Sequence, residues 1–168
     1  VRKYDLRPVK RELIVKCIEA ARLAPSACNS QPWQFIVVDT LELKNKLCDA
    51  MLRGAYGIMN HFIKEAPVLV IMVIDKAKWL TKACNVINDT KLYLIDIGIA
   101  CSHFILQAAE LGLGTCILGW FNERAVKRLL GISRTKRAHI IISIGYPSVD
   151  FKPKEKNRKT LSEISLYA

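Results

Sequence analysis

Apolar positions recur every three or four residues in several stretches of the chain, which is the spacing of a helix with one buried face. Short apolar runs rich in β-branched residues lie between them and are typical of strands. The predicted helices are 9–23, 39–54 with a cap at Asp39 or Thr40, 89–112 with a cap at Asp89 or Thr90, and 122–131 with a cap at Asn122. The predicted strands are 35–38, 68–74, 115–118 and 138–144.

The order of these elements favours one α+β domain over residues 1–168, with helices flanking a central sheet. The apolar run from Ala66 to Ile74 is far shorter than the roughly 20 residues of a membrane helix, so it predicts a buried strand and no membrane partner. Residues 75–88 lack a regular pattern and are predicted to form a loop or a short helix. Everything after Tyr146 predicts an extended arm, about residues 147–168.

The charge balance is strongly basic, with 26 Lys and Arg against 15 Asp and Glu and a formal net charge of +11. This charge would attract polyanions or anionic ligands, or would simply keep the protein in solution. The cations are spread along the chain apart from a cluster between Lys152 and Lys159, and no recognition helix or stacking platform accompanies them. A nucleic-acid partner is therefore not favoured. No charged and apolar leader precedes Val1, so we expect a cytoplasmic protein.

Cysteine and histidine spacing gives no metal site. The six cysteines are widely spaced, form no CxxC pair and fall mostly within predicted helices and strands. They predict buried free thiols in a reducing compartment. The three histidines stand far apart and show no ligand spacing beside the cysteines, so we expect no bound metal.

The stretch PSACNSQPW, residues 25–33, holds more hydrogen-bonding groups than a short connection needs. Ser26, Asn29, Ser30 and Gln31 supply donors and acceptors that could read the edge of a polar heterocycle. The same residue types are common turn formers and could serve only to cap helices and satisfy turn carbonyls. Both interpretations stay open on the residues alone.

The stretch LGLGTCILG, residues 111–119, is not a dinucleotide-binding loop, because it follows a helix and opens a strand, the reverse of that fingerprint. Gly112 and Gly114 are explained by a helix end and a turn. Gly119 comes directly after the predicted strand, where a glycine permits a flat ligand to approach the backbone.

The tail KPKEKNRKT, residues 152–160, places five cations and one anion on a segment with a proline. It could be a solvated tail. Alternatively, Lys156 and Arg158 are two positions apart on an extended chain, point the same way and could hold one phosphate. A second cationic cluster lies near the amino terminus, and both could serve one anion if the termini converge. That cluster is Arg2, Lys3, Arg7, Lys10 and Arg11.

These motifs resemble those of the FMN-dependent nitroreductase family in kind and in order. Four short stretches add to the resemblance: RKY at the start, GWF after residue 118, GYP at 145–147 and KNRK at 156–159. The resemblance implies a nitroreductase-like three-layer α-β-α fold with a central mixed sheet flanked by helices. It also implies an intertwined homodimer with FMN at the interface. The first residues of the family's amino-terminal RRSxR pattern are missing here, and we expect trimming rather than loss.

The resemblance also assigns site residues. Arg2 would lie near the pyrimidine edge of the flavin, and the loop of Pro25, Ser26, Asn29 and Gln31 would reach the flavin from the other subunit. The strand end of Ile117, Leu118 and Gly119 would lie against the ring, and Lys156 and Arg158 would hold the phosphate. Asn60 is a further candidate.

The implied activity is FMN-dependent NAD(P)H oxidoreduction, in which NADH or NADPH reduces the flavin at N5 and a nitroaromatic, a quinone or a related small-molecule acceptor reoxidises it in a ping-pong cycle. The chemistry takes place at flavin N5, so no catalytic acid or base is expected. A narrower flavoenzyme of the same fold, such as a reductive dehalogenase or an oxidase, remains an alternative. So do a flavin-binding module with little turnover and a basic adaptor for anionic partners. The acceptor pocket is predicted in residues 51–62 and 79–88.

Overall fold

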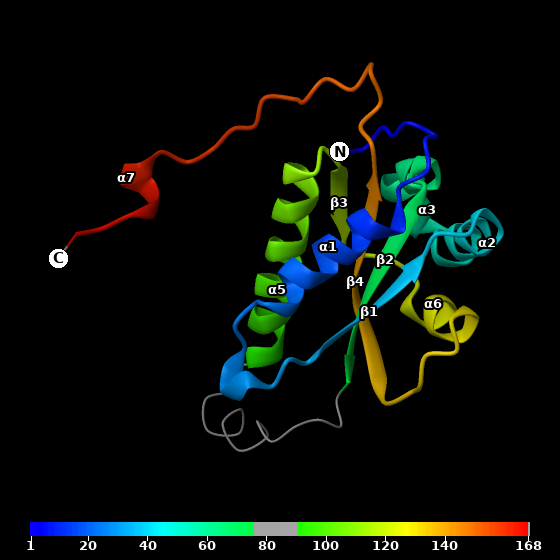
Figure 1. Ribbon diagram of the computed structural model, residues 1–168, viewed down its shortest axis with the longest axis horizontal. Helices are drawn as coiled ribbons and strands as arrows, with labels where there is room; N and C mark the ends of the chain where they lie inside the picture. The colour runs from blue at the N-terminus through cyan, green and yellow to red at the C-terminus, as the bar shows by residue number, and fades with distance from the viewer. Residues whose placement is uncertain (76–90, 168) are drawn as a thin grey trace.

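The computed structural model describes residues 1–75 and 91–167 (Figure 1). Its centre is a sheet whose strands lie in the order β1, β2, β4, β3. Every neighbouring pair in this sheet is antiparallel. The strands are β1 (Trp33–Val38), β2 (Val68–Asp75), β3 (Gly114–Leu118) and β4 (Lys136–Gly145).

The prediction of a mixed sheet is wrong for the described strands. β2 and β3 run in the same direction, but β4 lies between them and runs opposite to both. A parallel pair needs two hydrogen-bonded neighbours that run the same way, and the insertion of β4 prevents this. β1 and β2 are connected through helices and also pair in the antiparallel sense.

β2 explains why residues 68–74 are apolar at every position. Successive side chains of a strand point to opposite faces, and both faces of this sheet are covered. All seven side chains are at most 2% exposed, which confirms the predicted buried strand. Val68, Val70, Met72 and Ile74 join the core on one face, whereas Leu69, Ile71 and Val73 join the core on the other.

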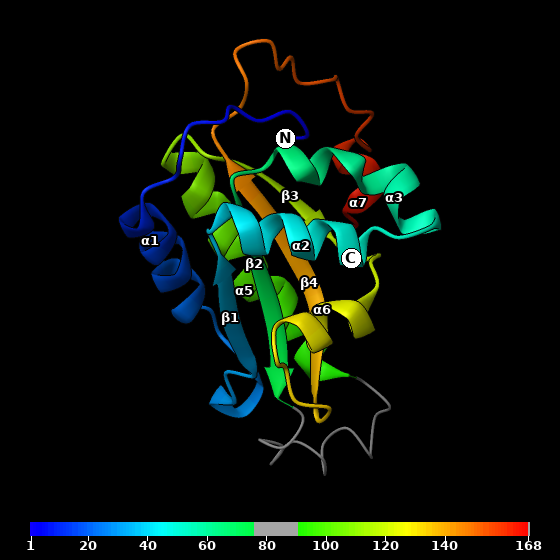
Figure 2. The same ribbon diagram turned by 90° about the vertical axis from the view of Figure 1, so that its right-hand side faces the viewer.

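Helices on both faces of the sheet make three layers, as predicted (Figures 1 and 2). α1 (Arg11–Arg22) and α5 (Leu92–Glu110) cover one face, and α2 (Leu41–Met51) and α6 (Glu123–Leu129) cover the other. α5 is long and apolar enough to cross a membrane by length and composition, a test that core helices also pass. It packs Ile97, Ala100, Cys101, Phe104 and Ala108 into the core with α1.

The capping predictions have mixed outcomes. Asn122 caps α6 as predicted, since its Oδ1 accepts a hydrogen bond from the Ala125 N–H at 3.1 Å. Thr40 occupies the position before α2 but makes no side-chain cap, and the Asp39 carboxylate is instead paired with Arg11 at 2.7 Å. α5 begins at Leu92, after Lys91, whereas the predicted caps Asp89 and Thr90 and the segment 76–88 lie outside the described residues.

Several short helical elements were not predicted. η1 (Ala27–Asn29) is a turn of 3-10 helix within the amide-rich loop, and α3 (Ala55–Asn60) and η2 (His61–Glu65) fill the stretch between α2 and β2. The second predicted helix, 39–54, ends earlier than expected, since α2 stops at Met51, and Gly54, with a φ of 67°, precedes α3. α7 (Leu161–Ile164) begins with a capping box between Thr160 and Glu163.

The cysteine prediction holds for the core positions only. Cys17, Cys48 and Cys101 are buried free thiols, and burial raises the pKa of Cys17 and of Cys101 to about 11. Cys28 is exposed, which contradicts the prediction, because it lies in the loop rather than in a helix or strand core. Cys116 is half-buried, and Cys84 falls outside the described residues.

The amino-terminal segment is fixed against the start of the carboxyl-terminal arm. Tyr4 pairs with Pro147 in an isolated antiparallel bridge, flanked by a hydrogen bond from the Asp5 N–H to the Tyr146 carbonyl at 2.9 Å. The buried Tyr4 hydroxyl lies 2.7 Å from Ser143 Oγ on β4. Beyond this point the arm runs away from the body, as predicted (Figure 1).

Gly145 is required where these segments meet, and replacing it with alanine should destabilise the fold. A Cβ at this position would lie 2.5 Å from Pro67 Cδ and 3.0 Å from Tyr4 Cδ1. We expect Gly145→Ala to lower the free energy of unfolding by about 1–3 kcal/mol, the usual effect of overpacking, as measured by urea denaturation. Gly98→Ala is the control, since a Cβ there meets nothing within 4 Å, and equal losses in both variants would contradict the steric explanation.

Candidate functional site

The end of β3, which the sequence predicts to face a flat ligand, is exposed to solvent on one side. β3 ends at Leu118, which is buried and holds the strand on the core, whereas Ile117 is 47% exposed. A Cβ placed on Gly119 would meet no atom within 4 Å. The space beside the Gly119 backbone is therefore open, and the approach of a planar group to it stays a prediction.

Helix α3 lies beside this strand end. The Asn60 amide donates a hydrogen bond to the Trp120 carbonyl at 2.9 Å, and the Tyr56 and Trp120 ring centroids are 5.0 Å apart in a tilted pair. Asn60, a minor candidate from sequence, is thus placed next to Gly119. Trp120 is half-exposed, and sequence reasoning did not identify its pairing with Tyr56.

Arg2 lies on the same side of the fold. Its guanidinium carbon is 5.3 Å from the centroid of the Phe62 ring in η2, a distance typical of a cation–π contact. The adjacent Val1 nitrogen donates a hydrogen bond to the Thr115 carbonyl of β3 at 2.7 Å. Arg2 therefore lies between the first residues of β3 and the segment that follows α3.

Lys156 and Arg158 are exposed on the arm, where they line an open hollow together with Glu155 and Asn157. Burial lowers the pKa of the Val1 amino group, the Cys116 thiol opposes this shift, and the positive charges of Lys156 and Arg2 lower the pKa further. The ion pair between Lys3 and Asp150 at 3.5 Å and the bridge between Tyr4 and Pro147 hold the amino-terminal segment beside the start of the arm.

Arg2, Lys156 and Arg158 have no acidic partner within the described residues, a property that they share with most of the described Lys and Arg residues. The ion pairs there use Lys3, Arg11, Arg22, Lys46, Lys64 and Arg137. Arg2, Lys156 and Arg158 take part in none of them. Their charge is available to an anionic ligand.

The loop PSACNSQPW has an unusual backbone. Cys28, Asn29 and Gln31 have φ values of 51°, 52° and 43°, in the left-handed region that residues other than glycine seldom adopt. Ser26 Oγ accepts a hydrogen bond from the Gln31 N–H at 3.0 Å, so Ser26 does serve as a turn former. The Gln31 side-chain amide donates to Asn29 Oδ1 at 2.9 Å.

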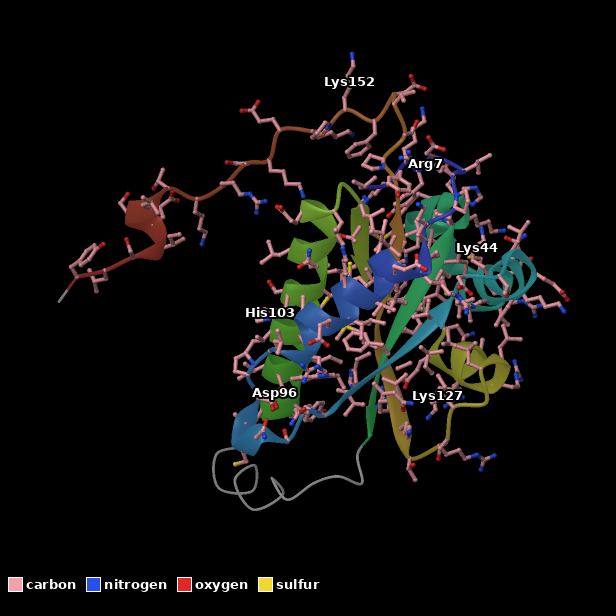
Figure 3. All side chains as sticks on the ribbon, viewed as in Figure 1. Arg7, Lys44, Asp96, His103, Lys127 and Lys152 are labelled. Carbon is pink, nitrogen blue, oxygen red and sulfur yellow. The ribbon has the colours of Figure 1, made fainter. Side chains whose placement is uncertain are left out.

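The loop is also tied to α5. Asp96, which is 4% exposed, accepts a hydrogen bond from the Ala27 N–H at 3.0 Å. Figure 3 places Asp96 at the end of α5 that adjoins the loop. Sequence analysis missed this contact, although Asp96 is the one acidic residue between Lys91 and Ala109 and such a residue in an apolar helix was a usable signal.

One protomer does not bring all the predicted residues together. The loop leads into Trp33, which is level with Ile74 and Arg137, whereas Gly114 at the start of β3 pairs with Gly145. These levels are roughly 25 Å apart at the rise of a β-strand. The loop with Pro25, Ser26, Asn29 and Gln31 therefore lies at the opposite end of the sheet from Arg2.

The two groups of residues fit different parts of an FMN molecule. Unpaired cations suit a phosphate and the electron-rich edge of a flavin, and open backbone at Gly119 suits a flat ring. The loop presents Gln31 Oε1 and Asn29 Nδ2, for which no partner exists in the described part of the chain, as an acceptor and a donor. The residues present thus fit the cofactor that the resemblance implies.

Comparison with known proteins decides the family. The sequence model of the Nitroreductase family matches residues 1–146. The chain belongs to the nitroreductase family. A relative from Methanothermobacter thermautotrophicus, provisionally named an NADH dehydrogenase/NAD(P)H nitroreductase, is 33% identical over 152 residues, which are 88% of this chain and 72% of the relative.

Two further similarities bear on this nitroreductase-family chain. An FMN-dependent nitroreductase from Clostridium difficile R20291 has a solved structure that superposes with a TM-score of 0.77 at 29% identity, covering 99% of this chain and 92% of the other. An iodotyrosine deiodinase from Thermotoga neapolitana is 25% identical over 99% of this chain and 93% of its own length. The nitroreductase fold is thus confirmed, and both names guide the choice of activity.

Proposed function

We propose that this chain is an FMN-dependent NAD(P)H oxidoreductase that reduces nitroaromatics, quinones or a related acceptor in a ping-pong cycle. The carrying observation is that Arg2 lies against Phe62 and the start of β3, without a carboxylate partner among the described residues, at the end of the sheet from which the arm with Lys156 and Arg158 extends. A cation already paired with a carboxylate would bind a phosphate less strongly. Membership of the nitroreductase family supports this proposal.

The proposed site is shared between two copies of the chain. The loop and the cations lie at opposite ends of one sheet, so one protomer would supply Asn29 and Gln31 and its partner the cations. Exposed apolar residues on α5 and on the arm support an intertwined homodimer, because a partner chain could bury them. They are Leu94, Ile95 and Leu106 on α5 and Leu161, Ile164, Leu166 and Tyr167 on the arm.

FMN would supply the hydride chemistry at its N5 atom, and the chain would bind and orient it. Lys156 and Arg158 would hold the phosphate, and the backbone of Ile117, Leu118 and Gly119 would line the ring. The guanidinium of Arg2 would stabilise the negative charge that develops at the pyrimidine edge on reduction. Pro25, Ser26, Asn29 and Gln31 of the partner chain would contact the rim and the ribityl chain. The free thiols of the described residues support a reducing compartment such as the cytoplasm.

Reductive dehalogenation is a second candidate, because relatives named iodotyrosine deiodinase match nearly the whole chain. The same shared site could take a haloaromatic acceptor in place of a nitroaromatic one. Measuring iodide released from iodotyrosine by the reduced protein separates the two activities.

The full-length chain loaded with FMN should be yellow, bleach with NADH or NADPH under nitrogen, and regain its colour when a nitroaromatic or a quinone is added. Size-exclusion chromatography with light scattering should give the mass of a dimer. Bound FMN that no nicotinamide bleaches would indicate a flavin-binding module without turnover. A chain that takes up no FMN but binds an oligonucleotide in a salt-dependent way would indicate a basic adaptor instead.

A further inference from the structure

Asp96 is a polar group in a part of the fold that is otherwise apolar. It projects from the second turn of α5 and is 4% exposed, and the same helix also buries Ile97, Ala100 and Cys101. Figure 3 places Asp96 near the end of α5. An ionisable side chain is costly to bury unless it makes a specific hydrogen bond. Within the described residues, the Asp96 carboxylate accepts such a bond from the Ala27 N–H at 3.0 Å.

The loop 25–31, which contains Ala27, needs a hydrogen bond that anchors it to the body of the fold. Ala27 directly precedes Cys28 and Asn29, whose left-handed backbones are each unfavourable for a residue with a side chain. The loop's own hydrogen bonds, from the Gln31 N–H to Ser26 Oγ and from the Gln31 amide to Asn29, connect loop residues only to one another. They shape the loop but do not fix it to the body. The bond to Asp96 joins Ala27 to a long, packed helix.

We propose that Asp96 is a positioning residue that holds the loop 25–31 in the conformation that presents Asn29 and Gln31 to FMN bound with the partner chain. This proposal rests on the proposed function. Asp96 does not touch the cofactor. It acts through the Ala27 N–H, and an oxygen acceptor at this position is sufficient for the role.

The test compares Asp96→Leu, which fills the same space without an acceptor, with Asp96→Asn, which retains Oδ1. Hydrogen exchange of the segment 24–33 in the full chain without FMN should be about tenfold faster in Asp96→Leu and nearly unchanged in Asp96→Asn. The dissociation constant for FMN, measured by quenching of flavin fluorescence, should rise about tenfold in Asp96→Leu only. Phe104→Leu is the control, because Phe104 is fully buried on the same helix but lies two turns beyond the loop.

The outcomes separate the proposals. If the parent binds FMN and Asp96→Leu binds it as tightly, the positioning role is overturned and the proposed function stands. If Phe104→Leu reproduces both effects, the effects reflect general destabilisation, and the positioning role is again overturned. If the parent binds no FMN, the proposed function fails, and the role of Asp96 in presenting the loop to FMN fails with it. The exchange data then decide whether Asp96 holds the loop.

Discussion

Replacing Lys156 and Arg158 together with alanine should weaken FMN binding about a hundredfold. Each side chain can make a charge-assisted hydrogen bond to the phosphate, and neither has a carboxylate partner within the described residues that would compete. Loss of both leaves the dianion to the weaker field of the remaining cations. The dissociation constant, obtained by fluorescence titration of the FMN-free protein, measures the effect.

The arm provides its own matched control. Lys152→Ala with Lys154→Ala removes the same charge from the same segment, at positions that the resemblance does not assign to the phosphate. Figure 3 places Lys152 on the part of the arm that leaves the body. We expect this variant to retain most of its affinity. If both double variants lose FMN equally, the arm acts through net charge alone, and the assignment of Lys156 and Arg158 is wrong.

Arg2→Ala should retain part of its FMN affinity but slow the reduction of the flavin by NADH about tenfold. A guanidinium near the pyrimidine edge stabilises the negative charge of the reduced flavin and raises its reduction potential. A loss of 1.4 kcal/mol of that stabilisation corresponds to about 30 mV for a two-electron couple. Stopped-flow reduction under nitrogen and a spectroscopic measurement of the potential test both statements.

Lys3→Ala is the neighbouring control. Lys3 is paired with Asp150 at 3.5 Å and faces the arm, so its loss should leave the reduction rate unchanged. Arg2→Lys keeps the charge and should restore part of the rate. Arg2 also packs on Phe62, so the thermal midpoint of each variant separates a folding defect from an electrostatic one. An unaltered reduction rate in Arg2→Ala would exclude the proposed role of Arg2.

Much of the architecture could be predicted because it depends on local pattern. The buried run 68–74, the capping residue Asn122 and the helix end at Gly112 each carry their signal within a few neighbouring residues. The wrong prediction of a mixed sheet concerns which strands lie side by side. That is decided by contacts between distant segments, such as the insertion of β4 between β2 and β3, and no short stretch of sequence encodes it.

The candidate site likewise has features that the sequence predicts and contacts that it does not. The donors and acceptors of Asn29 and Gln31 and the open backbone of Gly119 follow from residue type, whereas the roles that the resemblance assigns to them stay predictions. The bond from the Ala27 N–H to Asp96 spans 69 positions, and that from Asn60 to Trp120 spans 60. Such long-range bonds place the site residues relative to the core, and the local pattern of the sequence does not predict them.

The anchoring of Tyr4 has a consequence for the entropy of ligand binding. Its hydroxyl is fixed to Ser143 inside the fold, and the Arg2 Cα cannot lie more than about 7 Å from the Tyr4 Cα, since consecutive Cα atoms are about 3.8 Å apart. The short tether confines the guanidinium to a small volume before any anion arrives. An incoming cofactor then meets a charge whose freedom was largely lost during folding, and little further ordering of this segment opposes binding.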